Sequence, residues 1–209
     1  MNSDTPASIV LQPLVLYFGT PVALVTTLDE RGTANITPMS SAWALDDRLV
    51  LGLGAQSQGC VNLLRQREAV INLPEPALWP AIEKIARTTG RDPVPAGKRA
   101  LGFRHESDKF RLAGLTRAAS HEVAPPRIAE CPLQLETRLV HARPAAAAHG
   151  EAPDFHVLEV AVVKVHAHPQ IVLAGTQHID TGRWSPLLYV FRHYFGTGGR
   201  LGRNFRAEH

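Results

Sequence analysis

The sequence has few of the residues that mark several large classes of protein. It contains two cysteines, Cys60 and Cys131, which lie far apart and lack the spacing of a metal site or a disulfide framework. Such sparse cysteine is typical of a reducing compartment, so we expect a cytoplasmic protein. Aromatic residues make up 6% of the chain, no Lys/Arg block has aromatics interleaved, and the net charge is only +3. We therefore expect no nucleic-acid partner.

Long apolar runs are also missing. The run from Ile9 to Phe18 is interrupted by Gln12 and Pro13, and no basic residue precedes it. A membrane span needs about 20 apolar residues, and a signal peptide needs a basic start. We expect neither a membrane span nor a signal peptide. Instead, we expect this segment to pack on the core as an initial strand or a short helix.

The composition is otherwise that of a globular protein with many turns. Apolar residues make up 44% of the chain and charged residues 20%, and the 16 Gly and 16 Pro are scattered between apolar runs. A length of 209 residues suits one β-rich domain. We expect a single domain over residues 1–209.

Short apolar runs separated by turn residues predict an antiparallel sheet. Turn residues at 29–32 and 46–47 join the first runs into a predicted meander. Alternation of apolar and polar residues over 133–139 predicts a further strand with one wet face, and a long run of β-formers at 155–166 predicts another. The first five runs occupy residues 22–28, 33–37, 40–45, 48–53 and 69–73. Since strands do not alternate with helices, the pattern favours a mainly β, antiparallel barrel.

Two stretches depart from the β pattern. Ser57 is a candidate N-cap for a short helix that ends near Arg67. Residues from about 75 to 126 show helical spacing at first and then an irregular connection. We expect this second stretch to be a helical insert rather than a second domain, because it is short and poor in apolar residues.

Two polar loops interrupt the predicted strands, at Thr37–Ser41 and Ala55–Cys60. The first offers hydroxyl groups. The second precedes a helix, whose first backbone N–H groups have no partner within the helix. Together the two loops suit an anion such as a phosphate. For Ser40 and Ser41, a simple turn after Pro38 is an equally open interpretation from these residues alone.

The ten histidines do not form a metal-ligand pattern. His166 and His168 share one face at the end of a predicted strand, but no nearby carboxylate or cysteine completes a set of four ligands. We expect structural or surface roles for them and no metal site.

Motifs in a fixed order resemble those of the flavin reductase-like family. After the turn at residues 29–32 come NITPMSS, a Gly-ended strand, the second polar loop, a short helix and VINLP. Further motifs are TTGRDPVP, SDKF, RLAGLT, APPRIAECPLQLE and IDTGRWSPLLYVFRHYFGTG, so that the resemblance spans about residues 14–200. It implies an FMN-binding split barrel of the flavin reductase or flavoredoxin type. It also implies a homodimer that holds FMN non-covalently at or near the subunit interface.

The resemblance further implies which residues contact FMN. The matching positions are Thr37, Pro38, Met39, Ser40, Ser41, Ala55, Gln56, Ser57, Cys60 and Asn62. Cys60 departs from the family, which often has a hydroxyl residue there, and a thiol is a poor donor to phosphate. Its backbone N–H remains available to a ligand. Asn72 matches another common asparagine of the family, and both asparagines also allow a structural role.

The activity implied is that of an NAD(P)H:flavin oxidoreductase, which passes a hydride from nicotinamide to FMN and supplies reduced flavin to a partner oxygenase. The two cofactors carry that chemistry, so no catalytic triad is needed. The catalytic residues are unknown, with Arg192 and His193 as candidates, because a cation near the flavin would stabilise its reduced form. No Rossmann motif is present, so NAD(P)H would bind transiently. The alternatives are an electron carrier or flavin-holding protein without reductase activity, and an oxidase acting on a pyridoxal-type phosphate.

Overall fold

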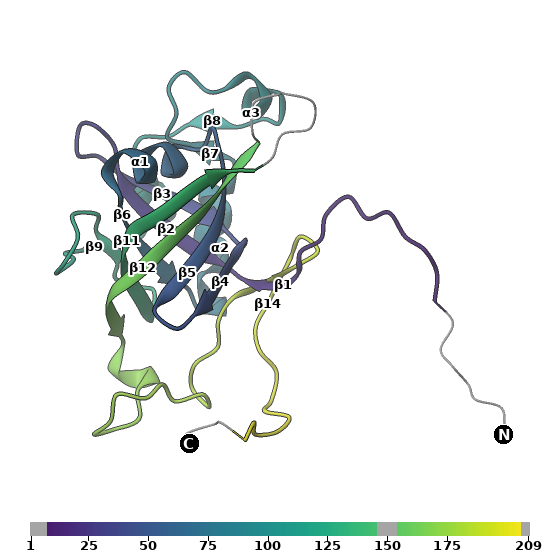
Figure 1. The fold of residues 1–209 in the computed structure, drawn as a ribbon, viewed down its shortest axis with the longest axis vertical. Helices are drawn as coiled ribbons and strands as arrows, with labels where there is room; N and C mark the ends of the chain where they lie inside the picture. The colour runs from purple at the N-terminus through teal and green to yellow at the C-terminus, as the bar shows by residue number, and fades with distance from the viewer. Residues whose placement is uncertain (1–7, 146–153, 206–209) are drawn as a thin grey trace.

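The computed structural model describes residues 8–145 and 154–205, and a seven-stranded antiparallel sheet forms its centre (Figure 1). The strand order is β3-β2-β6-β11-β12-β5-β4. The strands are β2 (Ala23–Leu28), β3 (Ala34–Met39), β4 (Ala42–Leu45), β5 (Arg48–Gly54), β6 (Glu68–Leu73), β11 (Leu133–Pro144) and β12 (Phe155–Ala167). The predicted mainly β, antiparallel architecture is confirmed.

The expected simple meander is wrong. The hairpins β2–β3 and β4–β5 form, but β3 and β4 lie at opposite ends of the strand order, and β6 pairs with β2. Ser40 and Ser41 therefore connect the two edges of the sheet. Pro38 lacks a backbone N–H, which suits β3 to an edge position. The backbone N–H of Gly52 in β5 donates to the Ser41 carbonyl at 2.8 Å, which attaches the connection to the far half of the sheet.

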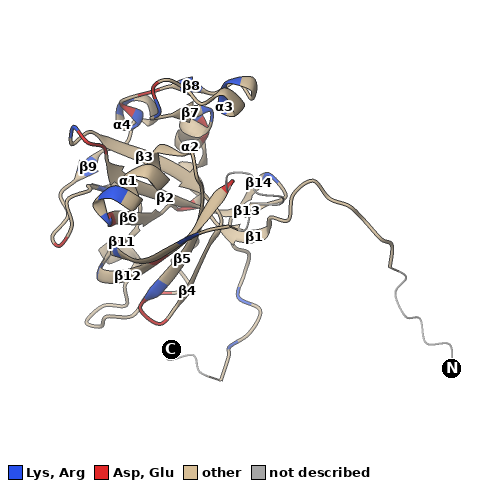
Figure 2. Ribbon diagram, turned by 45° about the horizontal axis from the view of Figure 1, so that its top comes forward, with Lys and Arg blue, Asp and Glu red and all other residues tan. Residues whose placement is uncertain are grey.

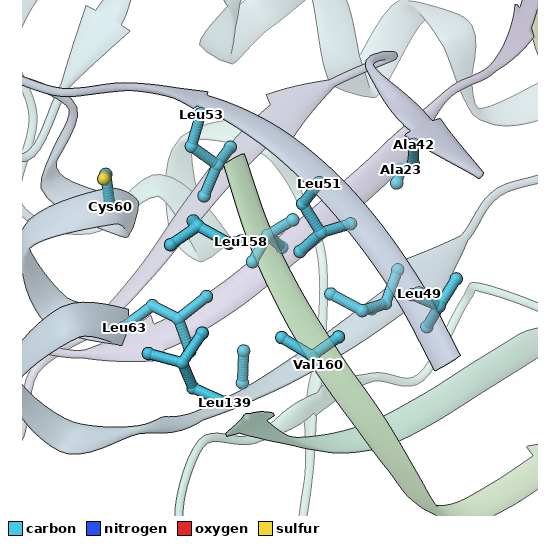
Figure 3. Packing of buried hydrophobic residues seen from close by; sticks show 13 residues of the cluster. Ala23, Ala42, Leu49, Leu51, Leu53, Cys60, Leu63, Leu139, Leu158 and Val160 are labelled. Carbon is cyan, nitrogen blue, oxygen red and sulfur yellow. The ribbon is translucent and has the colours of Figure 1, made fainter. Parts of the chain in front are cut away.

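Two hydrophobic clusters cover the sheet. One contains Leu51, Leu53, Leu63 and Leu158, all 2% exposed or less (Figure 3). The other lies between the sheet and the region of residues 75–126. Because β2 contributes Val25 to the first cluster and Leu24 to the second, this strand is buried on both faces, as its continuous apolar run predicts.

The short helix after the second polar loop is confirmed as α1 (Gln58–Gln66). Ser57 caps its start, and Arg67 ends it in the left-handed conformation at φ 63°. Cys60 and Leu63 face the first hydrophobic cluster. The helix therefore begins where β5 leaves the sheet and lies against the core along its apolar side.

The region of residues 75–126 is a series of short elements that cover one face of the sheet. Ile82 and Ile85 of its first α-helix and Phe110 of its last pack against Leu24 and Ile36. The elements are η1 (Pro76–Leu78), α2 (Trp79–Ala86), β7 (Thr88–Thr89), α3 (Ala96–Ala100), β8 (Arg104–His105), α4 (Lys109–Ala113) and β9 (Arg117–Ala118), and β9 pairs with β10 (Arg127–Ile128).

A three-stranded sheet joins the two ends of the described chain. It consists of β1 (Phe18–Pro21), β13 (Leu188–Val190) and β14 (His193–Phe195), and η3 (Pro169–Ile171) lies between it and β12. The predicted packing of residues 9–18 on the core is wrong. Ile9, Val10 and Leu14 are 81%, 96% and 93% exposed, and the segment extends away from the body (Figure 1). Within the described residues, no helix is long and apolar enough to cross a membrane.

Candidate functional site

A cavity of about 850 Å³ opens where the end of β3, the start of α1 and the 75–126 region meet. One part of its wall is polar and comes from the two predicted loops. Another part is apolar and aromatic, with Val22, Ile82, Tyr189 and Tyr194. A cavity of this size, with a few polar groups at one place and rings at another, suits a cofactor-sized ligand.

The whole first loop lines the cavity, from Thr37 to Ser41. Its position depends on Gly52, which faces Ser41 across the sheet connection. A Cβ atom at Gly52 would lie 3.2 Å from the Ser41 Cβ, so a side chain there would push the loop away. The Thr37 hydroxyl accepts a hydrogen bond from the Asn35 amide at 3.0 Å, which fixes its orientation.

The start of α1 meets the first loop directly. The Ser57 hydroxyl accepts from the Cys60 N–H at 3.2 Å, and the Ser57 carbonyl accepts from the Val61 N–H at 3.1 Å. The N–H groups of Gln58 and Gly59 thus precede the first hydrogen bond inside the helix. Gly59 has no side chain where it meets Thr37, and a Cβ there would overlap the Thr37 hydroxyl. Threonine hydroxyl and helix N-terminus therefore share one corner of the cavity.

Most of the residues predicted to contact the cofactor lie at this cavity, and three do not. The five residues of the first loop line it, as do Gln56 and Ser57. Ala55, Cys60 and Asn62 are outside the lining. The Asn62 amide donates to the Thr27 hydroxyl at 3.0 Å and accepts from the Gln58 side chain at 2.7 Å, so it ties α1 to β2.

Cys60 belongs to the hydrophobic core rather than to the cavity. It belongs to the same buried cluster as Leu53 and Leu63, and the residue is fully buried (Figure 3). Burial raises the pKa of the Cys60 thiol to about 11, so it stays protonated and unreactive at neutral pH. Its backbone N–H is already bonded to Ser57.

Asn72 has a structural role in the sheet. Its amide donates to the Leu24 carbonyl at 2.9 Å, and its oxygen accepts from the Ile128 N–H at 2.8 Å. The catalytic candidates Arg192 and His193 lie at the β13–β14 turn, outside the cavity lining. Arg192 is close enough to influence the Tyr189 hydroxyl electrostatically.

Two lysines of the 75–126 region line the cavity. Neither was predicted as a site residue, although Lys109 stands in the SDKF motif of the family resemblance, which is the signal that could have found it. Lys109 is 3% exposed, and its ammonium donates to the Ile36 carbonyl at 2.8 Å. The Lys98 ammonium lies 5.4 Å from the centre of the Phe103 ring. Burial, with a smaller effect of the Lys98 charge, lowers the pKa of Lys109 to about 7, although Glu106 opposes the shift. A five-residue helix is too short for its pattern to show which side chains face inward.

A row of aromatic rings forms the other end of the site. Ring centres are 5.4 Å apart for Tyr17 and Tyr189, 5.5 Å for Tyr189 and Tyr194, and 6.1 Å for Tyr194 and Trp79. The Tyr194 hydroxyl donates to the Glu83 carboxylate at 3.1 Å. Burial and the Glu83 charge raise the pKa of Tyr194, so the ring stays neutral. The register of a hairpin, in which Tyr189 and Tyr194 are opposite each other, is the signal that would have predicted this pair.

The two histidines considered as metal ligands have other partners. His166 Nε2 is 2.6 Å from the buried Glu136 carboxylate, and His168 Nε2 is 2.9 Å from the Ala129 carbonyl. Glu136 also accepts from the backbone N–H groups of His121 and Glu122. Burial alone would raise the pKa of Glu136, but these hydrogen bonds outweigh it and lower the pKa. The cluster anchors the segment before β10 to the sheet.

A mainly antiparallel sheet with a short helix at a loop-lined cavity is the architecture of FMN-binding split barrels, and the comparisons with known proteins agree. Residues 15–198 match the sequence model of the flavin reductase-like domain. The chain therefore belongs to the flavin reductase-like family. The resemblance seen in the sequence motifs and the split-barrel fold class are both confirmed.

Individual relatives extend this match over the whole chain. The uncharacterized protein YdfE of Bacillus subtilis (strain 168) is 42% identical over 207 residues, covering 99% of this chain and 98% of YdfE. Flavoredoxin of Desulfovibrio vulgaris (Miyazaki F) superposes with a TM-score of 0.76 at 19% identity, covering 96% of this chain and 99% of flavoredoxin. Nitrilotriacetate monooxygenase component B from Bacillus cereus gives a TM-score of 0.75 at 18% identity, covering 95% and 100%. At these identities the two structures establish the fold.

Proposed function

We propose that this protein binds FMN non-covalently in the 850 Å³ cavity and acts as an NAD(P)H:flavin oxidoreductase. One observation carries the proposal. In a chain of the flavin reductase-like family, a single cavity joins a corner rich in hydroxyl and amide donors to a wall of aromatic rings. FMN has the matching parts, since its phosphate is a dianion and its isoalloxazine is a flat apolar ring system.

The residues at the polar corner fit a phosphate. Thr37, Ser41 and Ser57 supply hydroxyls, and the first turn of α1 supplies the N–H groups of Gln58 and Gly59. The partial positive charge of a helix N-terminus favours an anion there. Because Gly59 has no side chain, the start of α1 can lie directly against Thr37, and this contact holds the two loops together.

The aromatic wall fits a planar ring and shields it from water. Tyr189 and Tyr194 lie next to each other across the β13–β14 hairpin, and Ile82 supports them from α2. When bound, FMN supplies the two-electron chemistry, by accepting a hydride from a nicotinamide. The protein positions the rings and fixes their surroundings. Because the Tyr194 hydroxyl is bonded to Glu83, that phenol is held in one orientation and keeps its proton.

The further features support a particular setting for this activity. We propose a homodimer, because apolar side chains of the N-terminal arm, including Ile9 and Val10, have no cover within the described chain. Both cysteines are free, which supports the cytoplasm as the compartment. One structural neighbour is described as a monooxygenase component, which supports a partner oxygenase as the acceptor of reduced flavin.

A second function is favoured by a specific observation. Lys98, Leu101 and Phe103 of the 75–126 region line the cavity and cover one side of it. A cover of this kind would keep nicotinamide from the flavin, leaving an FMN-binding electron carrier. The likeness to a flavoredoxin is in keeping with this alternative.

One spectroscopic experiment tests both functions. The purified protein is loaded with FMN, and its absorbance near the flavin bands is followed without oxygen as NADH or NADPH is added. In a reductase, one equivalent of NADH or NADPH reduces the bound flavin, and the flavin absorbance is lost. An electron carrier is bleached by dithionite but not by either nicotinamide. Failure to retain or bind FMN at all would refute both functions.

A further inference from the structure

Two lysine ammonium groups line the cavity without a carboxylate partner. Among residues 8–145 and 154–205, neither Lys98 nor Lys109 forms an ion pair within 4.0 Å. Lys109 is nevertheless more than nine-tenths buried in the cavity wall. Asp154 is the carboxylate in the lining, and it is not paired with either lysine. Each ammonium has three donors, and the one protein acceptor found for Lys109 is the Ile36 carbonyl.

The position of Lys109 relates it to the polar corner. The Ile36 carbonyl that it contacts is followed directly by Thr37, whose hydroxyl borders Gly59 at the start of α1. Lys98 is near enough to Lys109 for their charges to interact. Figure 2 shows α3 and α4, which carry the two lysines, at the same end of the molecule. The two ammonium groups therefore reach the cavity from the 75–126 region, whereas the polar corner is formed by the two loops and the start of α1.

Burying a cation without a close anion is unfavourable, and this cost lowers the pKa of Lys109. Its pKa is lowered to about 7, chiefly by burial and then by Lys98. The other charged group that acts on it is Glu106, which precedes α4. Nearby Asp108 is engaged by Arg117 at 2.7 Å, and Glu83 of the neighbouring α2 is engaged by Tyr194. Among the described residues no carboxylate forms an ion pair with Lys109 within 4.0 Å, and Glu106 acts on it only from farther away, so an anionic ligand would supply the missing close partner.

We infer that Lys98 and Lys109 form the second half of the phosphate site, facing the helix N-terminus, and that binding of the phosphate is coupled to proton uptake at Lys109. This inference rests on the proposed FMN function and goes further, because it gives the 75–126 region a ligand-binding role. The proton comes from solvent and adds to the neutral Lys109 amine. No other bond forms or breaks.

The coupling fixes the sign of the pH dependence. Below pH 7, Lys109 is already charged in the free protein, so binding takes up no proton there. Above pH 7, the free protein is largely neutral at Lys109, and a bound phosphate raises its pKa by favouring the ammonium. The dissociation constant of FMN then rises by up to about tenfold per pH unit. The phosphate itself, with its second pKa near 6, is already a dianion in this range.

The unmodified protein provides the first test. Dissociation constants are measured from pH 7 to pH 9 by flavin fluorescence, for FMN and for riboflavin, which lacks the phosphate. We expect FMN affinity to fall over this range while riboflavin affinity stays flat. Equal slopes for the two flavins, or a flat FMN curve, would overturn the inference. If neither flavin binds, the proposed FMN function itself fails, and this outcome is distinguishable from the others.

Variants separate a charge role from a structural one. Lys109→Met should reduce the preference for FMN over riboflavin at pH 7 by tenfold or more and abolish the pH slope. Lys109→Arg, which cannot lose its proton, should keep the preference and also lose the slope. Lys98→Met should reduce the preference by a smaller factor, and Lys84→Met on the exposed face of α2 is the matched control. If Lys109→Met raises the dissociation constants of FMN and riboflavin by the same factor, Lys109 has a structural role only and the inference is overturned.

A competition assay excludes the other source of a phosphate. NADP⁺ carries a phosphate monoester that NAD⁺ lacks, and either oxidised nicotinamide can compete with FMN without reducing it. We expect Lys98→Met and Lys109→Met to leave the ratio of the NADP⁺ and NAD⁺ inhibition constants unchanged within about twofold. A ratio that shifts with these variants, while the FMN preference does not, would overturn the assignment to the flavin phosphate.

Discussion

The contact between Gly59 and Thr37 allows a sharp prediction, because an ordinary helix rule and the local geometry give opposite signs. Replacing a helical glycine with alanine usually stabilises a protein by about 1 kcal/mol, since alanine loses less backbone entropy on folding. At Gly59, the added Cβ would lie 3.0 Å from the Thr37 Cβ and would overlap the Thr37 hydroxyl. We therefore expect Gly59→Ala to destabilise this protein.

The expected magnitude follows from the same geometry. Forcing an extra methyl group into a close-packed contact costs about 1–3 kcal/mol. Subtracting the helix gain of about 1 kcal/mol leaves a net loss of up to about 2 kcal/mol in the free energy of unfolding. Moving α1 away from Thr37 also separates the two halves of the polar corner. FMN affinity should accordingly fall by about tenfold, corresponding to about 1.4 kcal/mol.

Urea unfolding and FMN titration measure the two effects, and the chain provides a matched control for stability. Gly97 lies in α3, and a Cβ built there meets nothing within 4 Å. Gly97→Ala should therefore be stabilising or neutral. In the double variant with Thr37→Ala, which removes the overlapping hydroxyl, Gly59→Ala should cost at least 1 kcal/mol less than it does alone. A Gly59→Ala protein as stable as Gly97→Ala would refute the proposed contact.

Three further predictions concern other parts of the structure. Ser41→Asp or Ser57→Asp should weaken FMN binding at least tenfold while changing riboflavin binding less, and unchanged FMN affinity in both would place the phosphate elsewhere. Glu136→Gln should cost about 2–4 kcal/mol in urea unfolding at pH 7. The pKa of Glu136 is lowered from 4.5 by its hydrogen bonds with backbone amides and His166. Its contribution to the free energy of unfolding is therefore present above pH 4.5 and is lost as the pH falls through the folded-state pKa. The stability of the Glu136→Gln variant should accordingly depend less on pH in the acid range. Cys60→Ala should keep FMN affinity within twofold, and native Cys60 should resist alkylation at pH 8; rapid labelling would contradict its buried position.

Local patterns predict the elements of this fold well, because each is set by neighbouring residues. The Ser57 cap and the turn at residues 29–32 depend on sequence spacing alone, and both are present. The strand predicted over 133–139 is present within β11, but the expected wet face is wrong, because Gln134 and Glu136 are 2% and 0% exposed. The two polar loops were also recognisable, since their residues are polar between apolar strands. The structure brings both to one cavity.

The errors arise where distant parts of the chain decide the outcome. The sequence of short strands is the same whether or not β3 and β4 pair with each other. In the structure β6 pairs with β2, and β3 and β4 lie at opposite ends of the strand order. The apolar arm at residues 9–18 has the composition of a core segment but little of the chain to pack against. Lys109 stands in the SDKF motif, but the spacing of a five-residue helix does not show that its side chain is buried. Its burial depends on the Ile36 carbonyl, 73 residues away.

The neighbours of Lys109 explain how a buried cation can be held at the cavity. Phe110, the next residue, is fully buried in the cluster that contains Leu24 and Ile36, so the apolar contacts of the aromatic ring fix α4 against the sheet. The ammonium then reaches the free edge of β3 and donates to the Ile36 carbonyl, which no further strand could satisfy there. Hydrophobic burial of Phe110, worth about 2–3 kcal/mol, thus offsets the cost of placing Lys109 where no described carboxylate forms an ion pair with it. The same packing that stabilises the 75–126 region therefore also holds a cation beside the polar corner, and an anion bound there would add to the stability of both.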